Sequence, residues 1–198
     1  MKNLFLAIAK ELAAGHPCYL LTLAESEGST PRGIGAHMAV GADGLLGGTI
    51  GGGVMEYAAI TRARKLLLQK NAPSLVEHYD LTPGAGLACG GSCTVLFTPI
   101  CSADADVINR VLAYEQKREE YWLQVAWGSP FHRPNGGYLS LKKAAESLLS
   151  PQKRQGNIHI DGAKYYVEQF NYDGSVYVFG AGHVARELVP LLSHLGFT

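Results

Sequence analysis

The sequence predicts a mixed α/β protein, and three observations indicate this class. Short apolar runs typical of buried strands alternate along the chain with segments whose apolar residues recur every three or four positions, as on one face of a helix. Glycine-rich turns join several of these segments. Apolar residues make up 47% of the 198 residues, which is enough for one ample core or two modest domains.

The first region, 1–101, is expected to be an N-terminal α/β domain. Its apolar residues from Leu4 to Leu12 share one face of a helix, and Gly41 to Gly44 is a hairpin signal. The pattern predicts, in order, a helix over 2–12, strands over 18–23, 36–40 and 45–49, a helix over 54–70, and strands over 76–81 and 94–100.

The middle section, 102–175, carries little obvious chemistry, so we expect it to connect or to pack. The elements predicted there are a helix over 104–118, a strand over 121–127, a turn-rich patch over 128–137, a helix ending near Ser150, and strands near 157–161 and 164–170.

The last stretch, 176–198, is typical of the start of a Rossmann-like domain. A predicted apolar strand, Val176 to Phe179, runs into the nucleotide-binding fingerprint residues Gly180, Gly182 and Ala185. The second strand and the acidic residue of such a site do not follow, so NAD(P) binding is expected only of a complete domain. Because both faces of the strand are apolar, we also expect self-association or poor order here.

Charge and cysteine content limit the possible partners. The 17 basic residues balance 17 acidic ones, which disfavours nucleic acid and anionic membranes as partners. The N-terminal helix is too short to span a membrane, so we expect a cytoplasmic protein with reduced cysteines. Cys89 and Cys93 form a C-x3-C pair without a second pair, which disfavours a structural zinc site.

The most informative motif is the glycine run from Gly47 to Glu56, which lies between a predicted strand and a predicted helix. Free N–H groups and the positive end of the helix dipole favour a phosphate at Gly51–Gly53. Thr49 could add a hydroxyl donor. The alternative is a tight turn that lets the helix pack closely on the sheet, with Glu56 as a cap partner.

An arginine loop, Gly28 to Arg32, precedes the run. Arg32 suits bidentate phosphate recognition, and Ser29 and Thr30 could donate to the same anion. The alternatives are a surface salt bridge for Arg32 and a turn cap for the two hydroxyls.

A thiol flanked by glycines follows the run. Gly90 and Gly91 have no side chains, so Cys89 could approach a ligand closely. The alternative is a half-buried loop cysteine.

Taken together, these motifs resemble the XdhC/CoxI family of xanthine dehydrogenase accessory proteins. The resemblance rests on four segments: 28–38, 47–56, 86–91 and 176–197. It implies an N-terminal domain that holds the first three segments and a Rossmann-like domain that the fourth one opens. Such proteins bind a molybdopterin-type molybdenum cofactor, protect it while its terminal sulfur is installed, and pass it to a molybdenum hydroxylase. This sequence departs from the pattern because it ends where the Rossmann-like domain begins.

The resemblance also implies site residues and partners. Cys89 would lie near the molybdenum or its sulfide, and Glu56 could hydrogen-bond to pterin nitrogens. A molybdenum hydroxylase apoenzyme, a cysteine desulfurase and further copies of this chain are the expected partners. The residues expected to bind the cofactor are Ser29, Thr30, Arg32, Thr49, Gly51, Gly52, Gly53, Glu56, Cys89, Gly90 and Gly91.

We expect a binding and delivery protein rather than a catalyst, because no Ser-His-Asp set or acid–base pair stands out. Two other functions remain open. One is an oxidoreductase that binds a nicotinamide nucleotide at Gly180, and the other is a sulfur-transfer enzyme that uses Cys89 with Cys93 as the resolving thiol. His37 and His183 are expected to be structural.

Overall fold

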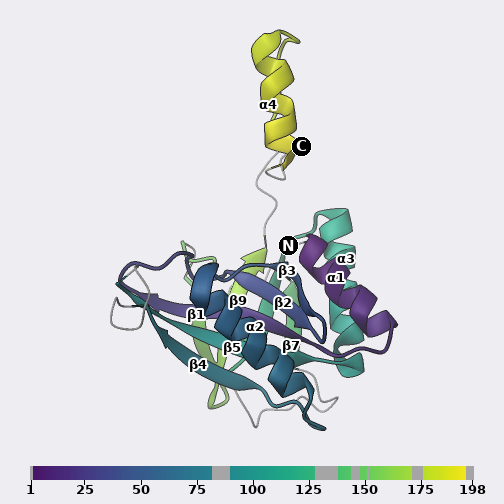
Figure 1. The fold of residues 1–198 in the computed structure, drawn as a ribbon. Helices are drawn as coiled ribbons and strands as arrows, with labels where there is room; N and C mark the ends of the chain where they lie inside the picture. The colour runs from purple at the N-terminus through teal and green to yellow at the C-terminus, as the bar shows by residue number, and fades with distance from the viewer. Residues whose placement is uncertain are drawn as a thin grey trace.

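The computed structural model describes residues 2–81, 90–127, 138–143, 148–150, 152–170 and 176–194. These residues form two antiparallel β-sheets and four α-helices (Figure 1), so the predicted α/β class is confirmed. None of the helices described is long and apolar enough to cross a lipid bilayer.

The larger sheet has five strands in the order β3-β2-β1-β5-β4, and neighbouring strands are antiparallel. The first seven residues of its central strand β1 are buried, because both faces of the sheet are covered. All five strands are confirmed, with differences from the prediction only at their ends. They are β1 (Cys18–Glu27), β2 (His37–Gly41), β3 (Gly44–Gly48), β4 (Leu75–Asp80) and β5 (Ser92–Ile100).

Helix α2 (Gly53–Leu67) covers one face of this sheet and begins at the last glycine of the glycine run. Its buried residues recur every three or four positions, as expected for an amphipathic helix. They are Met55, Ala59, Ala63 and Leu66. They share an apolar cluster with Leu21, Met38 and Phe97 of the sheet. The small side chains of the two alanines allow the helix to approach the sheet closely.

The opposite face is covered by α1 (Lys2–Ala13), α3 (Ala105–Lys117) and the second sheet. A short 3₁₀ turn, η2 (Ser102–Asp104), precedes α3. The second sheet has the strand order β7-β6-β9-β8. Its strands are β6 (Tyr121–Ala126), β7 (Leu139–Lys143), β8 (Gln155–Ile160) and β9 (Ala163–Phe170). One apolar cluster joins Leu20 of β1, Ile108 of α3 and Tyr166 of β9, so the first region and the middle section share a core.

The predicted helix ending near Ser150 is wrong for the described part of that region, because strand β7 occupies residues 139–143 and residues 148–150 are not helical. Leu139 and Leu141 alternate with polar residues and pair with Val125 and Leu123 of β6. Leu139 is fully buried in the shared core. Pairing with a buried strand outweighs the helix propensity of the leucine and lysine residues of β7.

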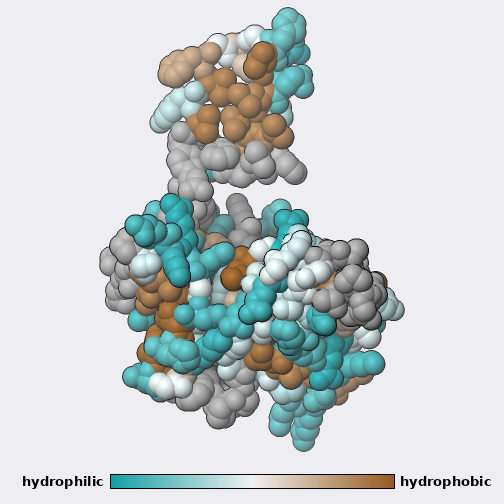
Figure 2. All heavy atoms as spheres, turned by 90° about the vertical axis from the view of Figure 1, so that its left-hand side faces the viewer, coloured by the Kyte–Doolittle hydropathy of each residue, from teal (hydrophilic) through white to brown (hydrophobic). Residues whose placement is uncertain are grey.

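The strand predicted over 176–179 is also wrong. The structure has no strand there, and helix α4 (His183–His194) follows. A strand needs hydrogen bonds to a neighbour, and among the described residues no strand lies beside this segment (Figure 1). Tyr177 is 79% exposed, Phe179 95% and Leu191 55%. Figure 2 shows the apolar side chains gathered on α4.

Candidate functional site

Antiparallel pairing brings the three glycine-containing segments to one edge of the larger sheet. The ends of β1 and β4 and the start of β5 meet there, since Ser92 pairs with both Glu27 and Asp80. The end of β3 meets the start of β2, where Gly48 pairs with Met38. The loops that leave these strand ends are therefore neighbours.

The loop after β1 touches Gly91 directly. A Cβ atom on Gly91 would lie 2.4 Å from the carbonyl oxygen of Glu27 and 2.5 Å from that of Ser29, so only glycine fits without backbone movement. Gly90 N–H donates to Leu81 O at 3.0 Å, and Leu81 N–H donates to Gly91 O at 2.8 Å. These bonds hold Gly90 and Gly91 at the base of the loop between β4 and β5.

The glycine run contacts the same loop. A Cβ atom on Gly51 would lie 3.2 Å from Cβ of Pro31, one residue before Arg32. The Arg32 loop thus packs on both other segments, which the sequence could only suggest as companions.

Glu56 is the acceptor for the glycine run. Its Oε2 atom accepts the Thr49 hydroxyl at 2.5 Å and the N–H groups of Ile50 and Gly52 at 3.0 Å each. Gly51 N–H donates to Thr49 Oγ1 at 3.2 Å. Glu56 lies in the first turn of α2, where a carboxylate also complements the helix dipole. The donors predicted to bind phosphate at Gly51 and Gly52 are therefore engaged within the protein.

Glu56 is held in its ionised form. Burial alone would raise the pKa of its carboxyl, but hydrogen bonds from Thr49 and from the backbone of the run outweigh burial and lower the pKa. A phosphate at these donors would displace the carboxylate or lie beside a like charge. The turn consequently offers a ligand an anionic acceptor next to the N-terminal end of α2 at Gly53.

The loop after β1 presents its polar residues at the surface. Thr30 Oγ1 donates to the carbonyl oxygen of Arg32 at 2.9 Å, so this hydroxyl closes the turn. Ser29 and Arg32 are exposed, which leaves the guanidinium accessible. Of the three predicted anion-binding residues in this loop, Arg32 is best suited to that role.

Of the two cysteines of the C-x3-C pair, the structure describes only Cys93. Cys89 lies outside the described residues. Cys93 is 1% exposed, and its Sγ atom lies 3.5 Å from Sδ of Met55 beneath α2. Burial raises the pKa of the Cys93 thiol, which makes it a poor resolving thiol. Across the part of the chain that the structure describes, no group of three His, Cys, Asp or Glu side chains could hold a metal ion.

Two adjoining cavities open at the same edge of the sheet. Their volumes are about 450 and 390 Å³, and both are lined by Glu27, His78 and Ser92. Gly90 and Gly91 line the second cavity. They provide room for part of a small organic ligand beside the three loops.

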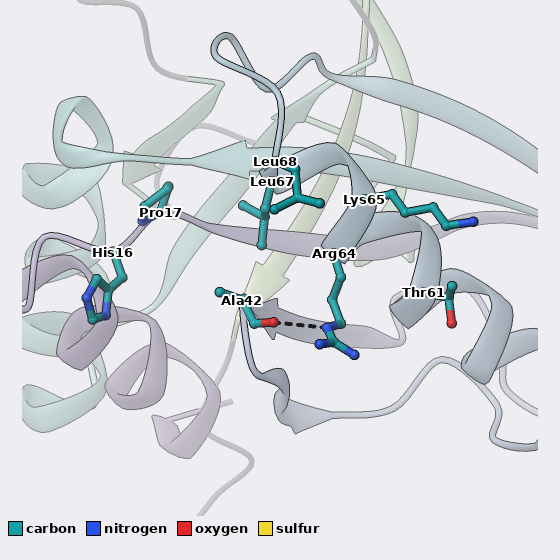
Figure 3. Close-up of a pocket in the computed structure, with 8 residues that line it drawn as sticks. All are labelled: His16, Pro17, Ala42, Thr61, Arg64, Lys65, Leu67 and Leu68. Carbon is teal, nitrogen blue, oxygen red and sulfur yellow. Dashed lines mark hydrogen bonds between the residues drawn. The ribbon is translucent and has the colours of Figure 1, made fainter.

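A separate cavity of about 440 Å³ lies at the other end of α2 (Figure 3). Leu67 and Leu68 contribute apolar surface, and Nε of Arg64 donates to the carbonyl oxygen of Ala42 at 2.9 Å. None of the predicted site residues lines this cavity, so we do not include it in the candidate site.

The structure adds two polar residues that the sequence did not single out, Gln155 and Glu168. His37 Nε2 donates to Glu168 Oε2 at 2.7 Å, and its Nδ1 atom is 3.0 Å from the Thr22 hydroxyl. Gln155 Nε2 donates to the carbonyl oxygen of Ile34 at 2.9 Å. The structural role expected for His37 fits these bonds, but its partner Glu168 is 131 positions away, and no local pattern indicates it.

The fingerprint residues are not part of this site. A Cβ atom added to Gly180 or Gly182 would meet no other atom within 4 Å, and both residues are exposed. They precede α4, and Ala185 lies in its first turn. Figure 1 shows this helix well away from the three loops. His183 begins that helix and is exposed.

Comparison with known proteins shows what the segment that carries most of the site resembles. Residues 11–80 match the XdhC and CoxI family. The predicted resemblance is thereby confirmed, and the matched range includes the Arg32 loop and the glycine run up to Glu56. It ends before Gly90 and Gly91.

Two individual proteins are also similar to this chain. The uncharacterized protein YqeB of Escherichia coli (strain K12) is 36% identical over 99 residues, which are 48% of this chain and 18% of YqeB. A crystal structure described as a xanthine dehydrogenase from Bacillus halodurans has a TM-score of 0.67 at 19% identity, over 98% of this chain and 60% of the other. At that identity the likeness shows a shared fold, and this chain spans less than two thirds of either protein.

Proposed function

We propose that the chain is an accessory protein that binds a molybdopterin-type molybdenum cofactor and delivers it to a xanthine dehydrogenase-type molybdenum hydroxylase. The family of residues 11–80 supports the proposal, as does the fold shared with a protein described as a xanthine dehydrogenase. The observation that carries it is the convergence of the Arg32 loop, the Glu56 turn and Gly90–Gly91 at one edge of the sheet.

The charged residues at this edge suit the two ends of such a cofactor. A pterin presents N–H donors, and Glu56 is an ionised acceptor whose position is held by bonds from the glycine run. The cofactor's phosphate needs a cation, and Arg32 offers an exposed guanidinium. In this account Thr49, Gly51 and Gly52 hold Glu56 in place.

The remaining residues would provide close approach and a soft donor. Gly53, Gly90 and Gly91 impose no side chains on a ligand that lies against the backbone. Cys89 precedes Gly90, and a thiolate is a suitable neighbour for molybdenum or its sulfide. Ser29 and Thr30 would contribute hydroxyl groups next to Arg32.

Delivery requires protein partners, which belong to the same proposal. The cofactor would pass to the hydroxylase apoenzyme by docking in the cytoplasm, after a cysteine desulfurase has supplied the terminal sulfur. The apolar face of α4 makes association with further copies of the chain part of the proposal.

A sulfur-transfer enzyme that uses Cys89 is the second candidate function. The burial of Cys93 argues against it, because a buried, protonated thiol cannot readily resolve a persulfide. A nicotinamide-dependent oxidoreductase is less well supported, since the strand before Gly180 does not form.

The test is cofactor binding by the purified chain, read by pterin fluorescence after oxidation and by molybdenum content. We expect Arg32→Ala and Glu56→Gln each to weaken binding about 10-fold or more, because each removes a charged hydrogen-bonding group. Cofactor binding by Cys89→Ala tests whether the thiol of Cys89 contributes to affinity.

Matched controls lie elsewhere on the chain. Arg64→Ala removes an arginine at the cavity of Figure 3, and Glu187→Gln neutralises an exposed glutamate on α4. Both should bind as the wild type does. Equal losses in test and control variants, or no binding by the wild type, would contradict the proposal.

A further inference from the structure

Backbone hydrogen bonds join the C-terminal end of the Arg32 loop to the larger sheet. Gly35 N–H donates to the carbonyl oxygen of Leu23, and Leu23 N–H donates to that of Ala36, at 2.9 Å each. Between Gly28 and Gly33 the loop is mostly exposed. The contacts of the residues near Gly35 therefore help to set the conformation of this loop.

Strands β8 and β9 of the second sheet supply those contacts. Gln155 donates to Ile34 O at 2.9 Å. A Cβ atom on Gly35 would lie 2.4 Å from Gln155 Oε1, 3.0 Å from the Tyr166 hydroxyl and 3.2 Å from Glu168 Oε1. Gly35 also has a φ of +86°, so glycine is favoured by conformation as well as by the close approach.

A buried polar chain joins the same strands to the start of β2, where the loop ends. Glu168 Oε2 accepts from His37 Nε2 at 2.7 Å and from the Tyr166 hydroxyl at 3.1 Å. The side chain of His37 is 1% exposed and that of Glu168 is 16% exposed. Hydrogen bonds to a charged group in such surroundings are costly to break, so this link is strong.

Strands β8 and β9 also contact the last part of β1, which leads into the loop. Asn157 Nδ2 donates to the carbonyl oxygen of Ala24 at 3.2 Å, and Lys164 Nζ lies 2.8 Å from Glu25 Oε1. Contacts from β8 and β9 thus reach both the last part of β1 and the first part of β2.

We infer that Gln155, Tyr166 and Glu168 are positioning residues that set the conformation of the Gly28–Ala36 loop, and with it the approach of Arg32 to the cofactor. The middle section then has a role in ligand binding, although it lies outside residues 11–80 and carries no motif of its own. This inference rests on the proposed function for its ligand, but the loop geometry itself does not.

The experiment compares Gln155→Ala and Glu168→Gln with Gln169→Ala. Gln169 follows Glu168 on β9, so its side chain points to the opposite face of the strand. Two readouts are taken: amide hydrogen exchange of residues 28–36 without ligand, and affinity for the molybdenum cofactor well below the unfolding temperature.

We expect both test variants to exchange about 3- to 10-fold faster over residues 28–36 and to bind the cofactor more weakly by a similar factor, since each loses about one hydrogen bond. Gln169→Ala should match the wild type in both readouts. A purely stabilising role would lower the unfolding temperature and leave the loop's exchange and the affinity at wild-type values, which would overturn the inference. If no variant and no wild-type protein binds the cofactor, the proposed function fails, and the exchange rates still decide whether β8 and β9 hold the loop.

Discussion

The chain contains two glycine-rich turns that each lead into a helix. Their sequences are alike, but their hydrogen bonding and their burial differ. At the start of α2, Thr49, Ile50 and Gly52 donate to Glu56, and Met55 is buried in the core of the larger sheet. At the start of α4, Gly180 and Gly182 are exposed, and no Cβ at either position would meet another atom.

The difference shows that a glycine-rich turn becomes a candidate site through the residues packed around it. Both turns suggest anion binding when only the sequence is considered. In the first turn an internal carboxylate takes the backbone donors, and two other loops close around the edge. Among the described residues no strand pairs with the segment before the second turn, and its glycines only precede a helix.

The largest contrast is expected between Gly91→Ala and Gly182→Ala. A Cβ on Gly91 would lie within 2.5 Å of two backbone carbonyl oxygens, so the loops must move apart. We expect a loss of about 1–3 kcal/mol in the free energy of unfolding for Gly91→Ala and a change within about 0.5 kcal/mol for Gly182→Ala. Urea unfolding of both variants measures this. Similar values for the two would mean that the loop contact at Gly91 contributes little.

The next contrast compares Glu56→Ala with Glu187→Ala. The first change leaves the N–H groups of Ile50 and Gly52 without their acceptor, whereas Glu187 is exposed on α4. We expect Glu56→Ala to lower the free energy of unfolding by about 1–2 kcal/mol and Glu187→Ala to change it by less than about 0.5 kcal/mol. A neutral Glu56→Ala would contradict the capping role.

Unfolding free energies of wild type and Glu56→Gln, measured over a range of pH, test the role of the Glu56 charge. The pKa of Glu56 is lowered in the folded protein, so the stabilisation is complete above the pKa of the unfolded chain, about 4.3, and is lost as the pH falls through the folded value. The difference in unfolding free energy between wild type and Glu56→Gln should therefore be constant from about pH 7 to pH 5 and shrink toward pH 3. A difference that does not change with pH would show that ionisation of Glu56 is unimportant.

The smallest effect is expected on α4. Leu191 is 55% exposed, so Leu191→Ser should change the free energy of unfolding by less than about 0.5 kcal/mol. The same variant should reduce any concentration-dependent association in sedimentation, because it breaks the apolar face of the helix. A loss of more than about 1 kcal/mol would mean that α4 packs against the rest of the chain.

Local sequence patterns were sufficient to predict most of the larger sheet and helix α2. The apolar run of β1 and the spacing of Met55, Ala59 and Ala63 depend only on neighbours in sequence, and these elements form as predicted. The alternative considered for Glu56, a cap partner, likewise involves residues only four to seven positions apart.

The features that the sequence did not predict all depend on residues that are far apart in the chain. Strand β7 forms because Leu139 pairs with Val125, and the segment 176–179 forms no strand because none lies beside it among the described residues. The contacts of Gln155 with Ile34 and of Glu168 with His37 span more than 120 positions, and a single sequence gives no signal of such pairs.

The most direct test of the proposed site is amide hydrogen exchange of the whole chain with and without bound molybdenum cofactor. We predict slower exchange over residues 26–35, 48–56 and 90–93 when the cofactor is present, with residues 183–194 unchanged. Protection confined to the start of α4, or absent from all three loops although the cofactor is bound, would contradict the account.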